Sequence, residues 1–184
     1  MEKWAKFSAE GKWLFKDQNP HLCKLLAPVI ERLRMEVGSR AIRILDLWCW
    51  DGRILKLLPE SWWPYEYTWV DTSDLLQLAR QNSNTLDWSR YTFHDGNAVD
   101  YVSSQWGSES FDLILLIQFL HYTNEWKVPE FVRSLYSILS KNGFLFYYMN
   151  DRYYHETPLV ETIKKLPFIY SKAYLQWVIA KKMS

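Results

Sequence analysis

Short apolar runs alternate regularly with helical patterns along this chain, and this order limits the folds open to it. Five runs typical of β-strands lie at 41–47, 65–71, 90–95, 111–120 and 143–150. Strands that are separated by helices pair in parallel, and runs such as DLILLI, which lack strict polar alternation, suit a sheet buried on both faces. The sequence therefore predicts an α/β fold with a doubly wound, mostly parallel sheet and helices on both faces.

Helical periodicity and helix-end residues predict the segments between these strands. Helices are expected at 21–37, 52–60, 74–82 and 124–143. The first follows Asn19–Pro20, and the pair Asn142–Gly143 is typical of a helix end. After the fifth strand, 157–166 is expected to be helical and 173–182 to form a last strand. We expect the partner of that strand to be reduced or absent.

Length and composition limit the class of protein. A chain of 184 residues with 48% apolar residues predicts one domain over 1–184. Its parts are a helical segment (1–40), a central core (41–150) and a short C-terminal segment (151–184). A formal charge of +1 gives no indication of nucleic-acid binding.

The cysteines and the apolar runs bear on the compartment. Cys23 and Cys49 are too few for a disulfide framework. The N-terminal residues lack the apolar stretch of a signal peptide, and no run is long enough to cross a bilayer. We therefore expect a cytoplasmic protein with no membrane partner and no metal site.

Polar residues follow the predicted strands at the positions where parallel sheets bind ligands. Asp46 lies near the end of the first strand, and a turn at 48–52 follows it. Asp71 ends the second strand, about 20 residues after Gly52, a spacing that suits hydrogen bonds to ribose hydroxyls. Because the carboxyl ends of parallel strands share one edge, we expect these residues to surround a single cleft.

Five segments in order resemble the motifs of one family. The chain has LDLWCWDG where that family has an LDLGCGDG-like turn, WVDTS where it has GVD-S, and Gly96-Asn97-Ala98 where it has a GDA-like element. It also has SFDLI followed by Leu120-His121-Tyr122, and LSKNG before the fifth strand. On these residues the chain resembles the class I S-adenosylmethionine-dependent methyltransferases of the compact methyltransferase-domain type. The resemblance implies a Rossmann-like sheet with an antiparallel last strand, and a cofactor-binding core at 41–150.

The resemblance also implies which residues bind S-adenosylmethionine. They are Asp46, Trp48, Cys49, Trp50, Gly52, Asp71, Thr72, Asn97, Ala98 and Gln118. Asp46 and the 48–52 backbone would face the methionine part of the cofactor, and Asp71 would bind the ribose hydroxyls.

The remaining implied contacts concern the adenine ring and the methyl group. Asn97 stands where the family has Asp, and its carbonyl oxygen would accept from the adenine amino group. The backbone N–H of Ala98 would contact the adenine ring. Gln118 would line the pocket near the methyl group.

Several of these residues have a structural alternative. Asp46 could cap the loop, and Asp71 could cap the helix at 74–82. Asp112 is expected to be structural, and Cys49 is expected to be a packed thiol.

No dedicated catalytic base stands out, which agrees with the chemistry of methyl transfer. An enzyme for this reaction mainly aligns the reactants, and it needs a base only if the acceptor must lose a proton. The weak candidates are His121 and Tyr122, followed by Tyr153 and His155.

Tryptophan stands at three family glycine positions, namely 48, 50 and 69. The chain has 6 glycines and 11 tryptophans, whereas average usage would give roughly 13 glycines. One explanation is a recoded gene, because some bacterial lineages read the codon UGA as glycine and others read it as tryptophan. The other is true Trp substitution with loss of cofactor binding. An indole at 48 or 50 would fill the space of the cofactor's amino-acid part, so the chain as written should bind the cofactor poorly.

The function expected is S-adenosylmethionine-dependent methyl transfer to an unidentified small-molecule acceptor in a bacterial cytoplasm. One alternative is a non-catalytic protein of the same fold that has lost cofactor binding. The other is an NAD(P)-dependent oxidoreductase, although a turn with glycine restored would read GxGxG and not GxGxxG. Nothing in the sequence indicates the oligomeric state.

Overall fold

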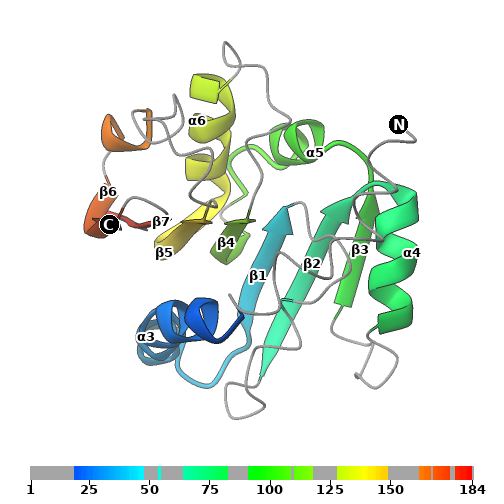
Figure 1. Cartoon of the computed structure of the whole chain (residues 1–184). Helices are drawn as coiled ribbons and strands as arrows, with labels where there is room; N and C mark the ends of the chain where they lie inside the picture. The colour runs from blue at the N-terminus through cyan, green and yellow to red at the C-terminus, as the bar shows by residue number, and fades with distance from the viewer. Residues whose placement is uncertain are drawn as a thin grey trace.

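A seven-stranded sheet in the order β3-β2-β1-β4-β5-β7-β6 forms the centre of the molecule (Figure 1). The structure is a computed structural model. It describes residues 19–47, 54, 64–82, 91–108, 110–117, 128–148, 162–166, 168–174 and 177–183.

Five strands of the sheet run parallel. They are β1 (Ile42–Leu47), β2 (Tyr65–Asp71), β3 (Tyr91–Asp95), β4 (Phe111–Ile117) and β5 (Leu139–Tyr148). The strand β7 (Trp177–Lys182) pairs antiparallel with β5 and with β6 (Phe168–Tyr174). The predicted mostly parallel sheet and its antiparallel last strand are both confirmed.

Helices cover both faces of the sheet, as predicted. They are α3 (Asn19–Val37), α4 (Ser73–Asn82), α5 (Ala98–Ser104) and α6 (Val128–Ile138). One apolar cluster joins α3 and α4 to the sheet, and a second cluster joins α5 and α6 to the opposite face. No helix in the described part of the chain is long and apolar enough to cross a membrane.

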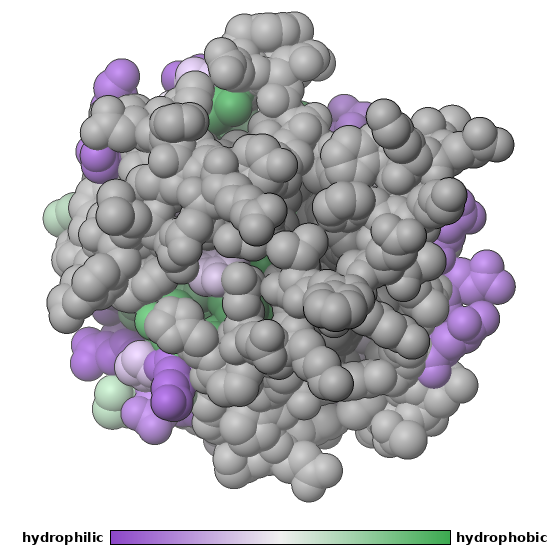
Figure 2. All heavy atoms as spheres, in the orientation of Figure 1, coloured by the Kyte–Doolittle hydropathy of each residue, from purple (hydrophilic) through white to green (hydrophobic). Residues whose placement is uncertain are grey.

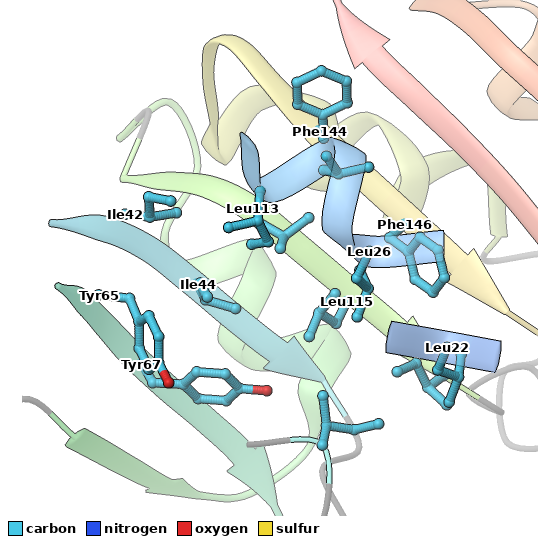
Figure 3. Packing of buried hydrophobic residues seen from close by; sticks show 14 of the residues in the cluster. Leu22, Leu26, Ile42, Ile44, Tyr65, Tyr67, Leu113, Leu115, Phe144 and Phe146 are labelled. Atoms are coloured by element: carbon cyan, nitrogen blue, oxygen red, sulfur yellow. The ribbon is translucent and has the colours of Figure 1, made fainter. Parts of the chain in front are cut away.

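The apolar stripe of α3 is what fixes this helix on the sheet. Leu22 and Leu26, one turn apart, are buried in the same cluster as Leu115 and Phe146 (Figure 3). Burial of each such side chain contributes roughly 1.5–3 kcal/mol. On the molecular face drawn in Figure 2, the most strongly hydrophobic of the coloured residues lie in recesses, and hydrophilic residues stand out at the margins.

The junction between α6 and β5 differs from the prediction. The helix expected over 124–143 ends at Ile138, and Leu139 already pairs with Phe111 of β4. The next pair joins Leu113 to Phe144, so the pairing is irregular between them. Asn142 lies inside this irregularity with φ 62°, a conformation that Asn tolerates better than most residues. The pair Asn142–Gly143 therefore shapes a strand and does not cap the helix.

The C-terminal prediction was wrong about the partner strand. The segment expected as a single strand over 173–182 divides between β6, which ends at Tyr174, and β7, which begins at Trp177. The hairpin therefore has both of its strands. The helix α5 was not predicted at all, and the helix expected at 52–60 lies outside the described residues apart from Ile54.

Candidate functional site

Two buried carboxyl groups lie near each other at the carboxyl edge of β1 and β2. The two strands are parallel, and their register places Asp46 opposite Trp69, two residues before Asp71. Asp46 is 1% exposed and Asp71 is 2% exposed, and the charge of Asp71 acts on Asp46. The predicted juxtaposition of these two acids at one edge of a parallel sheet is therefore present.

Asp46 is held by one tyrosine hydroxyl. The Tyr67 O–H donates to Asp46 Oδ2 at 2.8 Å, whereas Asp46 Oδ1 has no hydrogen-bond partner among the described residues. Burial raises the pKa of Asp46 to about 7; the Tyr67 hydrogen bond opposes this shift, and the charge of Asp71 adds to it. This carboxyl group consequently changes its charge near neutral pH and has one oxygen to offer to a ligand.

Asp71 joins the end of β2 to its neighbours. The Thr72 N–H donates to Asp71 Oδ1 at 2.7 Å, and the Gly96 N–H donates to the Asp71 carbonyl at 3.0 Å. Gly96 has φ 151°, in the range that side chains rarely adopt. The Thr72 carbonyl accepts from two N–H groups of the first turn of α4. These bonds fix the Asp71 backbone beside the loop that follows β3.

Asn97 caps α5. Its Oδ1 accepts from the Val99 N–H at 2.8 Å and from the Asp100 N–H at 3.4 Å. This is the oxygen that the resemblance assigns to the adenine amino group, and capping already engages it. The Ala98 N–H lies in the first turn of α5, where backbone N–H groups have no partner within the helix.

Trp69 is packed fully inside the aromatic cluster of this edge. Its ring lies 5.3 Å from the Tyr67 ring, 5.7 Å from the Tyr91 ring and 4.5 Å from the Phe93 ring, centroid to centroid. Its indole Nε1 is nevertheless buried without a hydrogen-bond partner among the described residues. An unsatisfied buried donor costs about 1–3 kcal/mol. The space at position 69 therefore holds the volume of the tryptophan ring, but none of the described residues accepts a hydrogen bond from its Nε1.

Several predicted site residues lie outside the described part of the chain. They are Trp48, Cys49, Trp50, Gly52, Gln118, His121 and Tyr122, together with Tyr153 and His155. Their roles stay predictions. Among the described residues, no group of three or more His, Cys, Asp or Glu side chains could hold a metal ion.

Asp112 is structural, as expected, and lies at the opposite edge of the sheet. Arg40 donates to its two oxygens at 2.6 and 2.8 Å, and the Arg43 N–H and the Ser140 hydroxyl donate at 2.9 and 2.8 Å. Burial acts to raise the pKa of Asp112, but the hydrogen bonds from Arg40, Arg43 and Ser140 outweigh it and hold the pKa well below its ordinary value. This carboxylate is fully engaged in holding β1, β4 and β5 together.

Tyr67 is the residue that sequence reasoning missed. The strand YEYTWVD alternates faces, so Tyr67, Trp69 and Asp71 share the face that carries Asp46. The alternation was visible in the sequence, but the contact between Tyr67 and Asp46, which lie 21 positions apart, depends on the register between their strands.

A family comparison agrees with this geometry. The methyltransferase domain family matches residues 45–145, more than half of the chain. The chain belongs to the class I S-adenosylmethionine-dependent methyltransferase family. The match runs from within β1 to within β5 and includes Asp46, Asp71 and Asn97. Comparison with curated proteins finds no match.

Solved structures share the fold of this methyltransferase domain. A candidate O-methyltransferase of Nostoc punctiforme is 16% identical, with a TM-score of 0.67 over 97% of this chain and 60% of its own. An O-methyltransferase family protein of Burkholderia thailandensis is 17% identical, with a TM-score of 0.60 over 95% of this chain and 62% of its own. An S-adenosylmethionine-dependent methyltransferase of Methanosarcina mazei is 15% identical, with a TM-score of 0.60 over 82% of this chain and 97% of its own. The chain thus spans about three fifths of the length of the first two proteins.

Proposed function

We propose that this domain transfers a methyl group from S-adenosylmethionine to a small-molecule acceptor. The observation that carries the proposal is the meeting of Asp46 and Asp71 at the carboxyl edge of β1 and β2, where parallel sheets bind ligands. A small acceptor is proposed because the net charge of +1 offers no strongly basic character for a nucleic acid.

The described residues of this edge fit the cofactor. Asp71 is a hydrogen-bond acceptor at the end of β2, suited to ribose hydroxyls. Asp46 Oδ1, which is buried and has no partner among the described residues, is suited to a cationic group. The Ala98 N–H, in the first turn of α5, can donate to the base.

The chemistry asks little of the protein beyond alignment. When bound, S-adenosylmethionine supplies a methyl group that is already activated by its sulfonium. The acids and the first turn of α5 would orient the methyl group, and the buried edge would exclude water from it. A general base is needed only for an acceptor that must lose a proton, and His121 and Tyr122 are the proposed candidates for that step.

The proposal includes glycine as the native residue at positions 48, 50 and 69. At position 69 the indole nitrogen supports this, because a residue selected for this place would rarely leave a buried donor without a partner among the described residues. The gene sequence tests the proposal without any protein: UGA codons at these positions support recoding, and UGG codons would end it.

Ligand-induced thermal stabilisation tests the function. The chain as written and a Trp48→Gly/Trp50→Gly variant are heated with S-adenosylmethionine, S-adenosylhomocysteine or NAD. We expect the glycine variant to gain several degrees with the first two ligands, since binding at 100 times Kd contributes about 2.7 kcal/mol. Trp106→Gly, which removes a 60% exposed indole, is the control and should gain nothing.

Two other outcomes would replace the proposal. Stabilisation by NAD alone would favour an oxidoreductase. No stabilisation of any variant would favour a non-catalytic protein of this fold, a function that true tryptophans at 48 and 50 would suit.

A further inference from the structure

We propose that Tyr67 is a positioning residue that keeps the Asp46 carboxyl group poised to recognise the extra positive charge of the methyl donor. This inference rests on the proposed function, because it concerns the ligand of the same edge. Tyr67 lies outside the five segments that resemble the family motifs. The property proposed for it, which those motifs do not carry, is a preference for the charged donor S-adenosylmethionine over the neutral thioether product S-adenosylhomocysteine.

The two oxygens of Asp46 are unequally engaged in hydrogen bonds. The Tyr67 hydroxyl, which comes from the neighbouring strand, donates to Oδ2 at 2.8 Å. Oδ1 is buried and accepts nothing from the described residues. A carboxyl group held by one oxygen keeps a fixed orientation, so the other oxygen is presented in one direction.

The described groups that act on Asp46 are one hydroxyl donor and one further acid. On the neighbouring strand β2, Tyr67 and Asp71 are the polar groups that act on it. On the other side, β4 places the apolar Leu115 opposite it. The described side chains of α3 in the apolar cluster on this face include Leu22 and Leu26, and the half-buried Arg34 of the same helix donates to the Pro64 carbonyl. No cation acts on Asp46 from the described residues, and a second acid opposes its ionisation, so a bound cation would be its natural counter-charge.

The charge of Asp46 should affect which of the two ligands, donor or product, binds more tightly. S-adenosylmethionine carries one positive charge more than S-adenosylhomocysteine, at the sulfonium. Ionised Asp46 attracts that charge, whereas protonated Asp46 does not. Because burial raises the pKa of Asp46 to about 7, the preference for the donor should grow as the pH rises through neutrality. Tyr67 favours the ionised form by donating a hydrogen bond to it, and therefore sets where this growth occurs.

Calorimetric titration of the full chain tests the inference. Kd values for S-adenosylmethionine and S-adenosylhomocysteine are measured from pH 5.5 to 9 in the Trp48→Gly/Trp50→Gly background. Tyr67→Phe and Tyr91→Phe are then added singly. Tyr91→Phe is the matched control, since it removes a buried hydroxyl from the same aromatic cluster but from β3, two strands away from β1.

The expected result is a preference for the donor that rises with pH and is altered by one variant only. In Tyr67→Phe the midpoint should move up by about one pH unit, and donor affinity at pH 7 should fall about fivefold. Product affinity should change less, and Tyr91→Phe should match the parent.

Two results would overturn the inference, and they are distinguishable. If both ligands bind but Tyr67→Phe and Tyr91→Phe give the same pH profile, Tyr67 has only a packing role and the proposed function stands. If neither ligand binds any variant at any pH, the proposed function fails, and the inference fails with it.

Discussion

A buried aspartate lies at each edge of the sheet, and the two aspartates have opposite surroundings. At the amino edge, Asp112 accepts hydrogen bonds from Arg40, Arg43 and Ser140, and its pKa lies well below the ordinary value. At the carboxyl edge, Asp46 has one donor and a second acid nearby, and burial raises its pKa to about 7. Both carboxyl groups are buried but their partners differ: Asp112 has two arginines and a serine as donors, whereas Asp46 has one tyrosine and a neighbouring acid. One edge holds the strands together, and the other keeps an acid available to a ligand.

The largest expected effect is the cost of ionising Asp46 in the folded chain. A raised pKa in the folded state means that the stability contributed by Asp46 is fully present below about pH 4 and is lost as the pH rises to about 7. The loss is at most about 4 kcal/mol. Asp46→Asn should remove this part of the pH dependence, as measured by urea unfolding at a series of pH values. Identical curves for both proteins would show that the two edges do not differ in this way.

The complementary change at the amino edge should act in the opposite direction. Asp112→Asn removes the charge that organises Arg40 and Arg43, and we expect a loss of about 3 kcal/mol at pH 7. A lowered pKa stabilises the fold above about pH 4, and this stability is lost as the pH falls below that value. The variant should therefore lose the acid-sensitive part of the unfolding curve. Ser137→Ala is the control, because it removes a hydroxyl that accepts an exposed hydrogen bond from the Gly107 N–H. We expect it to change the free energy of unfolding little.

The smallest effect concerns the loop after β3. Asn97 uses its carbonyl oxygen to cap α5, which leaves an amide nitrogen where the family has a second carboxylate oxygen. Asn97→Asp should keep the cap and add an acceptor for the adenine amino group. We expect donor binding about fivefold tighter in the glycine variant, measured by calorimetry. Unchanged or weaker binding would show that the base does not meet this residue.

The sequence predicted the strands well because their apolar content reflects burial on both faces. It also predicted that Asp46 and Asp71 would meet, since the end of each parallel strand lies at the same edge. The end of α6 was misplaced because Leu139 continues into a strand only by pairing with Phe111, far away in the sequence. β6 was missed for the same reason, since it is defined by its pairing with β7.

Different roles for Asp46 and Asp112 were expected, but the donors that produce the difference were beyond the reach of the sequence. Asp46 and Asp112 each lie within an apolar strand, and their local patterns look alike. What separates them is the set of donors that arrives from other strands, such as Tyr67 for one acid and Ser140 for the other. The helix α5 was also missed, because the capping role of Asn97 is a matter of side-chain geometry.

Cofactor titration of one matched pair of variants shows whether Asp46 and Asp71 form the cofactor edge. Asp71→Asn and Asp95→Asn are compared by calorimetry with S-adenosylmethionine in the Trp48→Gly/Trp50→Gly chain. The two acids end neighbouring strands and lie opposite each other, but Asp71 is buried and Asp95 is exposed. If Asp46 and Asp71 form the cofactor edge, Asp71→Asn weakens binding at least tenfold, the equivalent of about 1.4 kcal/mol, and Asp95→Asn leaves it unchanged. Equal binding by both variants, or weakening by Asp95→Asn alone, would contradict the account.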